Sequence, residues 1–160
     1  MGKSFITLFA RDLKIAWGED SRYWRWIHVE DKSTSMLVDA AELIRVCFLE
    51  VRAKFDTRIL SPGIKYEVAF VMMIKDNAEG WEHPVKFGFV SPNGKQEERE
   101  ENFTKIKPIN EWIEIPVGEF IASSEIKNQV GEMEIYLHGS EGLYWKKGIV
   151  IKGVIIRSKN

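Results

Sequence analysis

The amino-acid sequence predicts an all-β fold, a two-sheet antiparallel β-sandwich of the jelly-roll kind, in a single domain over residues 1–160. Apolar and polar residues alternate with a period of two along much of the chain, and turn residues interrupt this alternation at short intervals. A chain of this length buries about two thirds of its unfolded surface in one core. Many short strands of this kind pack most economically as two facing sheets.

The first half of the chain predicts five strands. Residues Leu49–Asp56 show the pattern most clearly, because one parity is apolar and the other is charged, so one face of this strand is expected in water. Residues Tyr66–Ile74 are apolar at both parities, which indicates a central strand covered on both sides. The remaining strands of this half are expected at Phe5–Ala10, Lys14–Trp17 and Trp24–Glu30.

The second half predicts four more strands and little helix. These strands are expected at Val85–Val90, Trp112–Val117, Met133–His138 and Ile149–Arg157. The run Asp39–Leu43 is expected to start a short helix and Gly118–Ile121 to form one helical turn, although neither sustains a period of 3.6. Residues Gly94–Asn110 are polar and lack alternation, which predicts a long, mobile surface loop.

Composition and charge exclude several classes of function. The formal net charge of −1 provides no bulk field to attract nucleic acid or an anionic membrane, so binding must rely on a local site. No apolar run approaches the length of a membrane span, and the stretch Phe5–Ala10 is too short for a signal peptide. The single cysteine, Cys47, cannot form an internal disulfide, which suits a reducing compartment. We therefore expect a cytoplasmic protein that is not secreted.

The sequence contains no pattern that indicates catalysis, a metal site or a cofactor. His28, His83 and His138 lie far apart and lack the spacing of metal ligands. A glycine-rich phosphate loop and a nucleophile elbow are also missing. The acidic run Glu97–Glu101 is typical of a solvated face. We therefore expect no metal, no cofactor and no enzymatic activity.

Aromatic residues gather in one stretch, residues 17–26, with the sequence WGEDSRYWRW, which holds three of the six tryptophans. If one strand ends at Trp17 and the next begins at Trp24, the two indoles stand at the rims of the loop between them. Trp24 and Trp26 share one face of their strand because strand residues alternate. We expect Trp26 to enter the core and Trp24, next to the loop, to stay partly exposed.

Two indoles at one opening suit a sugar. The apolar face of a pyranose stacks on an indole, and its hydroxyls take polar hydrogen-bond partners. Polar side chains are present within the same stretch at Glu19, Asp20, Arg22 and Tyr23. Two alternatives stay open: that all three tryptophans are core residues, and that the aromatics stack nucleobases, against which the balanced net charge counts.

Five pieces of the sequence, taken in order, resemble the Nictaba-type plant lectins, the phloem lectin family. They are Ala10–Trp17 with Tyr23–Trp26, Ala41–Val46, Tyr66–Ile74, Glu111–Phe120 and Trp145–Gly153. Together they extend over nearly the whole chain. The resemblance implies a jelly-roll lectin that binds N-acetylglucosamine oligomers, including chitin fragments and the core of N-glycans on glycoproteins, without hydrolysing them.

The resemblance also implies site residues. In the family, the tryptophan that closes a Leu-x-Ile-x-Trp piece and the first tryptophan of Tyr-Trp-x-Trp are linked to sugar binding; they correspond to Trp17 and Trp24. Asp20 and Tyr23 are expected as polar partners, with Glu19 behind them. This implication agrees with the placement of both indoles at the rims of one loop.

Further expectations concern the end of the chain and the partners. Trp145 and Lys146 fall in a matching family segment, but a core or sheet-edge role fits Trp145 equally well. The apolar residues at both parities of Ile149–Ile156 are compatible with a homodimer through this strand, and equally with a strand buried on both faces. The family implies phloem sap as the location. An RNA-binding phloem transport protein, using the same aromatics and the lysines of residues 146–159, is the alternative function.

Overall fold

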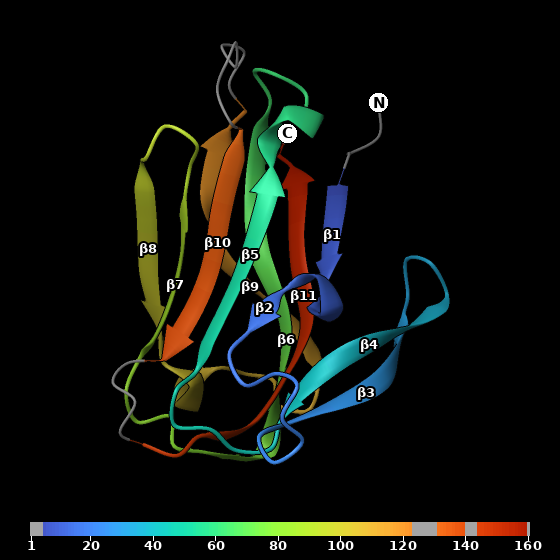
Figure 1. Cartoon of the computed structure of the whole chain (residues 1–160), viewed down its shortest axis with the longest axis vertical. Helices are drawn as coiled ribbons and strands as arrows, with labels where there is room; N and C mark the ends of the chain where they lie inside the picture. The colour runs from blue at the N-terminus through green and yellow to red at the C-terminus, as the bar shows by residue number, and fades with distance from the viewer. Residues whose placement is uncertain (1–4, 123–130, 140–143, 160) are drawn as a thin grey trace.

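The chain folds as a β-sandwich in the computed structural model, which describes residues 5–122, 131–139 and 144–159 (Figure 1). This confirms the predicted fold class. The described elements are strands β1 (Phe5–Phe9), β2 (Lys14–Ile15), β3 (Trp24–Asp31), β4 (Met36–Leu43), β5 (Glu50–Asp56), β6 (Lys65–Glu79), β7 (Val85–Val90), β8 (Gln96–Glu101), β9 (Trp112–Ile121), β10 (Glu132–Gly139) and β11 (Lys147–Ser158), and the 3₁₀ turns η1 (Ala10–Asp12), η2 (Thr57–Ile59) and η3 (Phe103–Lys105).

Two antiparallel sheets face each other across one core. The first has the order β3-β4-β11-β6-β9, and β1 also pairs with β11. The second has the order β2-β5-β10-β7-β8. Phe70 of the first sheet meets Phe87 of the second edge to face, with ring centroids 5.4 Å apart, and both rings are fully buried. Aromatic pairs of this geometry add to the hydrophobic energy that holds the two layers together.

The alternation read from the sequence corresponds to the observed faces. On β5, Val51, Ala53 and Phe55 are buried. The intervening residues of this strand form ion pairs on the outer face, as Arg52 does with Glu134. Strand β6 is central as predicted, between β11 and β9. Only its inner face is fully buried, however, since several outer side chains, among them Val71, are half-buried.

Two predicted helical segments are strands instead. Residues Asp39–Leu43 belong to β4, which pairs with β3 along its whole length and with β11 at Glu42 and Ala41. Residues Gly118–Ile121 extend β9, where Phe120 lies opposite Tyr66 of β6. In both places the weak local preference for helix is overridden because pairing with a neighbouring strand satisfies the backbone and buries the apolar side chains.

The predicted loop Gly94–Asn110 also contains a strand. Residues Gln96–Glu101 form β8, which pairs with β7 at the edge of the five-stranded sheet. Most of its side chains are exposed. A strand with both faces largely in water shows no alternation of hydropathy, and charged residues suit an edge because they discourage pairing with another chain.

The order of burial of the two tryptophans on β3 is the reverse of the prediction. Trp24 is 2% exposed and belongs to the core, whereas Trp26 is half-buried at its margin. The reason is the course of the β3–β4 hairpin, which diverges from the sandwich toward its turn (Figure 1). Strand β4 pairs with β11 only near its own end, so the residues beside the loop lie over the core and the later ones extend beyond it.

Strand β11 lies inside its sheet. It pairs with β6 on one side and with β4 and β1 on the other, and Ile149, Ile151, Val154 and Ile156 are fully buried. Burial within one chain therefore explains most of its apolar residues, whereas Ile155, on the other face of the strand, is half-buried. Among the described residues, no helix is long and apolar enough to cross a bilayer.

Candidate functional site

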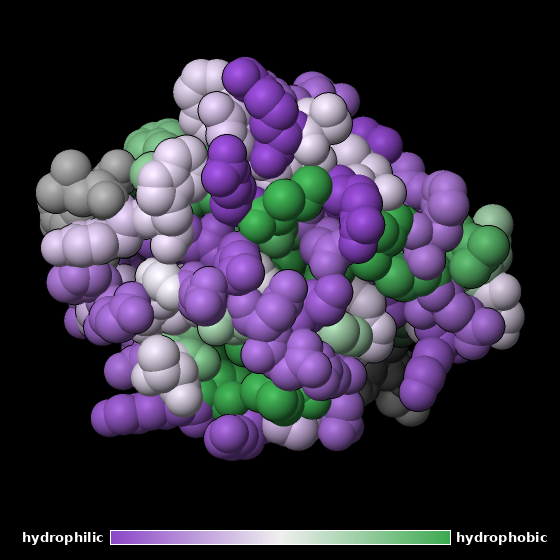
Figure 2. Space-filling view, turned by 90° about the horizontal axis from the view of Figure 1, so that it is seen from below, coloured by the Kyte–Doolittle hydropathy of each residue, from purple (hydrophilic) through white to green (hydrophobic). Residues whose placement is uncertain are grey.

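Five connections between strands meet at one end of the sandwich, the lower end in Figure 1. They are the connections β2–β3, β4–β5, β6–β7 and β8–β9, and residues 144–146 of the connection β10–β11, and we call this end the loop end. Exposed large apolar side chains occur there on four of these connections: Trp17, Ile44, Phe48, Ile109, Tyr144 and Trp145. Viewed from below, this end shows hydrophobic patches between polar side chains (Figure 2).

The β2–β3 connection, residues 16–23, is called the Trp17 loop. Consecutive tight turns shape it, with Gly18 N donating to the Ile15 carbonyl (2.9 Å) and Asp20 N to the Trp17 carbonyl (3.0 Å). Tyr23 N and Trp24 N both donate to the Asp20 carbonyl, each at 3.0 Å. Internal hydrogen bonds of this kind give a short loop a defined shape.

The indole of Trp17 is 56% exposed, and its backbone has a φ of 65°. A bulky residue in this left-handed region is strained by about 1–2 kcal/mol. Its ring meets that of Tyr23 edge to face at 5.8 Å, so one aromatic supports the other. The loop thus holds a large apolar side chain toward solvent at a cost in backbone energy.

Two buried or half-buried indoles hold the loop from beneath. Trp24 Nε1 donates to the Ala16 carbonyl (3.2 Å), and Trp26 Nε1 donates to the Gly18 carbonyl (2.9 Å). Trp24, predicted as a rim residue of the opening, therefore has no indole face available to a ligand. It contacts the loop backbone from the core.

Asp20 forms a two-point ion pair with Arg22. Arg22 Nη2 lies 2.7 Å from Oδ2 and Nε lies 3.0 Å from Oδ1 of the carboxylate, and the backbone N–H of Arg22 also donates to Oδ1. The side-chain hydrogen bond from Arg22 is the main reason that the pKa of Asp20 is lowered to about 2. The carboxylate keeps acceptor capacity toward solvent, since each oxygen has more than one lone pair.

Glu19 is directed to a second arginine. Its carboxylate lies 3.5 Å from Arg11 Nη1, while Arg11 Nε donates to Asp39 at 3.0 Å. The Arg11 guanidinium also stacks on Trp26, 3.7 Å from the ring centroid. Because Glu19 is largely exposed, its ion pair with Arg11 contributes little to stability and leaves the carboxylate accessible.

Ile15 and part of the Trp17 loop line an open depression of about 600 Å³. It is lined by Ile15, Trp17, Gly18, Glu19, Asp20 and Ser21. An exposed indole beside two carboxylates can bind a ligand that has an apolar face and a rim of hydrogen-bond donors.

Trp145 and Lys146 point in opposite directions. The Trp145 indole is 55% exposed, with the Arg45 guanidinium 5.1 Å from its ring centroid. Lys146 is 3% exposed, and its Nζ donates to the carbonyls of Cys47 and Tyr144, both at 2.9 Å. Burial lowers the pKa of Lys146. Trp145 is therefore not a core residue, whereas the buried ammonium group of Lys146 is not accessible to a ligand.

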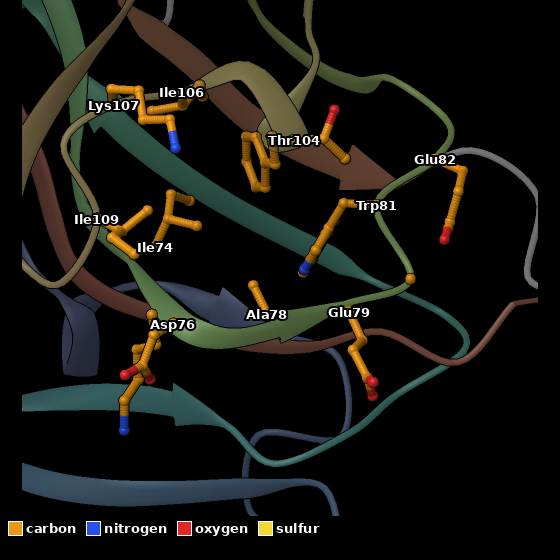
Figure 3. A pocket seen from close by; sticks show the side chains of 13 residues that line it. Ile74, Asp76, Ala78, Glu79, Trp81, Glu82, Thr104, Ile106, Lys107 and Ile109 are labelled. Atoms are coloured by element: carbon orange, nitrogen blue, oxygen red, sulfur yellow. The ribbon is translucent and has the colours of Figure 1, made fainter.

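A second pocket, of about 460 Å³, lies between the end of β6 and the η3 segment (Figure 3). Trp81 and Phe103 form part of its wall, with ring centroids 4.9 Å apart. Trp81 is buried and its Nε1 donates to the Lys147 carbonyl. Figure 3 shows Glu79 and Glu82 on the side opposite Ile106 and Ile109. The indole of Trp81 serves packing, and it has no exposed face to offer here.

Sequence reasoning found Trp17 and the acidic residues beside it but missed Arg11 and Arg45. Both arginines reach the site through tertiary structure, from η1 and from the β4–β5 connection, and no local pattern marks them. Across residues 5–122, 131–139 and 144–159, no three His, Cys, Asp or Glu side chains are grouped so as to hold a metal ion.

Comparison with protein families gives a match that extends over nearly the whole chain. Residues 3–158 match the family described as Phloem protein 2. An Arabidopsis thaliana protein named PHLOEM PROTEIN 2-LIKE A1 is 40% identical over 153 residues, which are 95% of this chain and 61% of that protein. A protein of Luffa acutangula named Lectin is 37% identical over 95% of this chain and 69% of its own length. The chain thus spans less than two thirds of the length of the first of these relatives.

A solved structure shows likeness in fold. The crystal structure of a Podospora anserina GH26-CBM35 β-(1,4)-mannanase aligns with a TM-score of 0.53 and 8% identity, over 98% of this chain and 28% of that one. At this identity the likeness concerns the arrangement of strands alone.

Proposed function

Because the chain belongs to the phloem protein 2 family, we propose that it is a lectin that binds N-acetylglucosamine oligosaccharides on the Trp17 loop and does not hydrolyse them. The observation that carries this proposal is the exposed indole of Trp17, held outward in a left-handed backbone conformation beside carboxylates. Strain of this kind persists where the surrounding structure imposes it, which is typical of binding sites. The name of the Luffa relative, Lectin, supports the same class of function.

The chemistry of the loop suits an N-acetyl sugar. The C–H face of a pyranose stacks on the Trp17 indole, and Tyr23 keeps that indole upright through its edge contact. The carboxylates of Asp20 and Glu19 accept hydrogen bonds from hydroxyls and from the acetamide N–H. Trp24 takes part by holding the Ala16 carbonyl and hence the loop, without touching the sugar.

RNA is the second candidate ligand, and the charge pattern of the loop disfavours it. Two arginines near Trp17 are already engaged by carboxylates, Arg22 by Asp20 and Arg11 by Glu19 and Asp39. A phosphate backbone would meet this acidic surface. Binding of RNA through released counterions also predicts a steep loss of affinity with added salt, whereas sugar binding barely responds.

The proposal extends to the biological setting. The family name supports phloem sap as the location. We further propose a cytoplasmic protein, with defence of the plant against chitin-bearing organisms as one role. Chitin fragments and N-glycan cores of glycoproteins offer the same chemistry, so both are candidate ligands. A homodimer would raise avidity for glycoproteins that carry several glycans.

Calorimetric titration with chitotriose tests the proposal on the wild type, Trp17→Ala and a control, Ile59→Ala. Ile59 is 65% exposed in η2, after the upper end of β5, so the control removes an exposed apolar side chain far from the loop end. We expect Trp17→Ala to lose at least tenfold in affinity and Ile59→Ala to bind like the wild type. Absence of binding by the wild type, or equal affinity of all three folded proteins, contradicts the proposal.

A further inference from the structure

A second exposed tryptophan at the loop end resembles the first in its surroundings. Trp145 is as exposed as Trp17, and each indole has a neighbouring side chain that supports it: Tyr23 for Trp17, and Arg45 for Trp145. Tyr144 is exposed as well, and its ring is tilted against that of His83, with the ring centroids 4.7 Å apart. A large apolar side chain kept in water on each of two loops needs an explanation, because burial of either would be favourable.

The backbone around Trp145 is fixed, so its exposure is imposed by the fold. Lys146 and Val46 form an isolated antiparallel β-bridge. Lys146 N donates to the Val46 carbonyl oxygen at 2.9 Å, and Val46 N donates to the Lys146 carbonyl oxygen at 3.0 Å. The Trp145 carbonyl packs against Gly80, where a Cβ atom would come within 2.0 Å of the carbonyl oxygen. Since Lys146 is directed inward, the alternation of side chains along the segment directs Trp145 outward.

Trp145 is joined to Tyr23, whose ring contacts that of Trp17, by a short path of backbone hydrogen bonds and peptide bonds. Ile44 N and Arg45 N donate to the Tyr23 carbonyl at 2.8 and 3.3 Å, and Val46 pairs with Lys146. With roughly 5 Å across each antiparallel pair and roughly 3.3 Å per residue along a strand, Tyr23 and Trp145 lie within about 20 Å of each other. Both loops therefore belong to the end seen in Figure 2.

We propose that Trp145 and Arg45 form a second sugar subsite, so that a single oligosaccharide chain lies across the loop end from Trp17 to Trp145. This inference rests on the proposed function and names its ligand more closely: a linear chain of several N-acetyl sugars. The Trp145 indole offers a stacking face, and the Arg45 guanidinium donates hydrogen bonds to acetamide carbonyls and hydroxyls. The two subsites differ in their hydrogen-bonding groups: carboxylate acceptors lie beside Trp17, and the guanidinium donors of Arg45 lie beside Trp145.

Length dependence of binding distinguishes a second subsite from a single one. Calorimetry is performed with the N-acetylglucosamine disaccharide and pentasaccharide on the wild type, Trp145→Ala, Trp145→Phe and Trp17→Ala, with Ile59→Ala as the control. We expect the wild type to prefer the pentasaccharide. Trp145→Ala should lose about tenfold in affinity for the pentasaccharide and stay within about twofold for the disaccharide, as stacking on one aromatic is worth about one such factor. Trp145→Phe, which keeps an aromatic face, should recover most of the loss.

The outcomes separate this inference from the proposed function. If the wild type binds neither sugar, the proposed function itself is wrong. If the wild type binds both and Trp145→Ala matches it for both, the second subsite is wrong while the proposed function stands. An equal loss for both sugars in Trp145→Ala also overturns the inference, because it indicates one shared site. Circular dichroism confirms that each variant is folded.

Discussion

The indole Nε1 of Trp24 donates a hydrogen bond of 3.2 Å to the carbonyl of Ala16, the first residue of the Trp17 loop. Trp24 itself is buried in the core. The core and the loop are therefore linked through one side chain, and a change at Trp24 reaches the site through the shape of the loop. This distinguishes Trp24 from Trp17, whose indole stands in solvent.

Trp24→Phe tests this distinction. Phenylalanine keeps most of the apolar volume but lacks the N–H, so we expect a loss of about 1–2 kcal/mol in the free energy of unfolding. Because the loop keeps its other hydrogen bonds, affinity for chitotriose should fall by only a few-fold, well short of the loss in Trp17→Ala. Urea denaturation and calorimetry measure the two effects. A loss of affinity as large as that of Trp17→Ala in a stably folded Trp24→Phe would indicate direct contact with the sugar.

The strained backbone of Trp17 gives a second prediction. Glycine adopts a φ of 65° without penalty, whereas alanine keeps the strain. Trp17→Gly and Trp17→Ala both remove the indole, so both should lose sugar binding. We expect Trp17→Gly to be more stable than Trp17→Ala by about 1 kcal/mol, a net value after the greater freedom of glycine in the unfolded chain. Paired urea denaturation curves measure this difference, and equal stability would show that position 17 carries no strain.

Local patterns in the sequence located most of the strands, but they missed β4 and β8 and did not give the depth of individual side chains. Alternation located strands such as Val85–Val90 because each has one buried face. The exposure of Trp24 and Trp26 could not be read in this way, since it depends on where the β3–β4 hairpin leaves the sandwich, and that is set by pairing with β11. Arg45 lies near Trp145 for a similar reason, because the pairing of Val46 with Lys146 joins segments a hundred residues apart.

Two glycines with similar backbones should respond differently to alanine. Gly63 and Gly80 have φ values of 79° and 89°, so each substitution costs about 1–2 kcal/mol from conformation alone. A Cβ at Gly63 meets no atom within 4 Å, whereas at Gly80 it would lie 2.0 Å from the Trp145 carbonyl oxygen. We therefore expect Gly80→Ala to destabilise the fold clearly more than Gly63→Ala in urea denaturation. Similar losses in the two variants would mean that the Trp145 segment shifts freely, which would remove the support for an imposed exposure of its indole.

Asp20 and Asp56 form a matched pair for a prediction on pH. Each accepts hydrogen bonds from the side chain and the backbone of the arginine two residues later, and in each the arginine side chain is the main cause of a pKa lowered from 3.8 to about 2. A lowered pKa means that the stabilisation is present above about pH 4 and is lost as the pH falls through about 2.

For both Asp20→Asn and Asp56→Asn, the difference in Tm from the wild type should therefore shrink over this range of pH. Only Asp20 lies beside Trp17, so only Asp20→Asn should weaken binding of chitotriose at neutral pH. Thermal denaturation from pH 5 to pH 2 and calorimetry at neutral pH provide the comparison. An equal effect of both variants on affinity would assign the loss to general stability and exclude Asp20 as a sugar partner.

Lys146 gives the last prediction, because its charge is buried against two carbonyl groups. Burial lowers the pKa of its ammonium group below 10.5, so in the interval below that value the unfolded chain binds more protons than the folded one. Stability due to this group therefore rises with pH through that interval and levels off above about 10.5. Lys146→Met, which keeps the length of the side chain, should lack this rise. The free energy of unfolding is measured against pH by urea denaturation for the wild type and for the variant, and the difference between them isolates the effect of Lys146 from that of other titrating groups. If the stability of the wild type and of Lys146→Met changed with pH in parallel, the ammonium group would not be desolvated.

At neutral pH, Lys146→Met also lacks the hydrogen bond from residue 146 to the Cys47 carbonyl. The variant should therefore weaken binding of the pentasaccharide more than that of the disaccharide, as expected of a residue that positions Trp145 without touching the sugar.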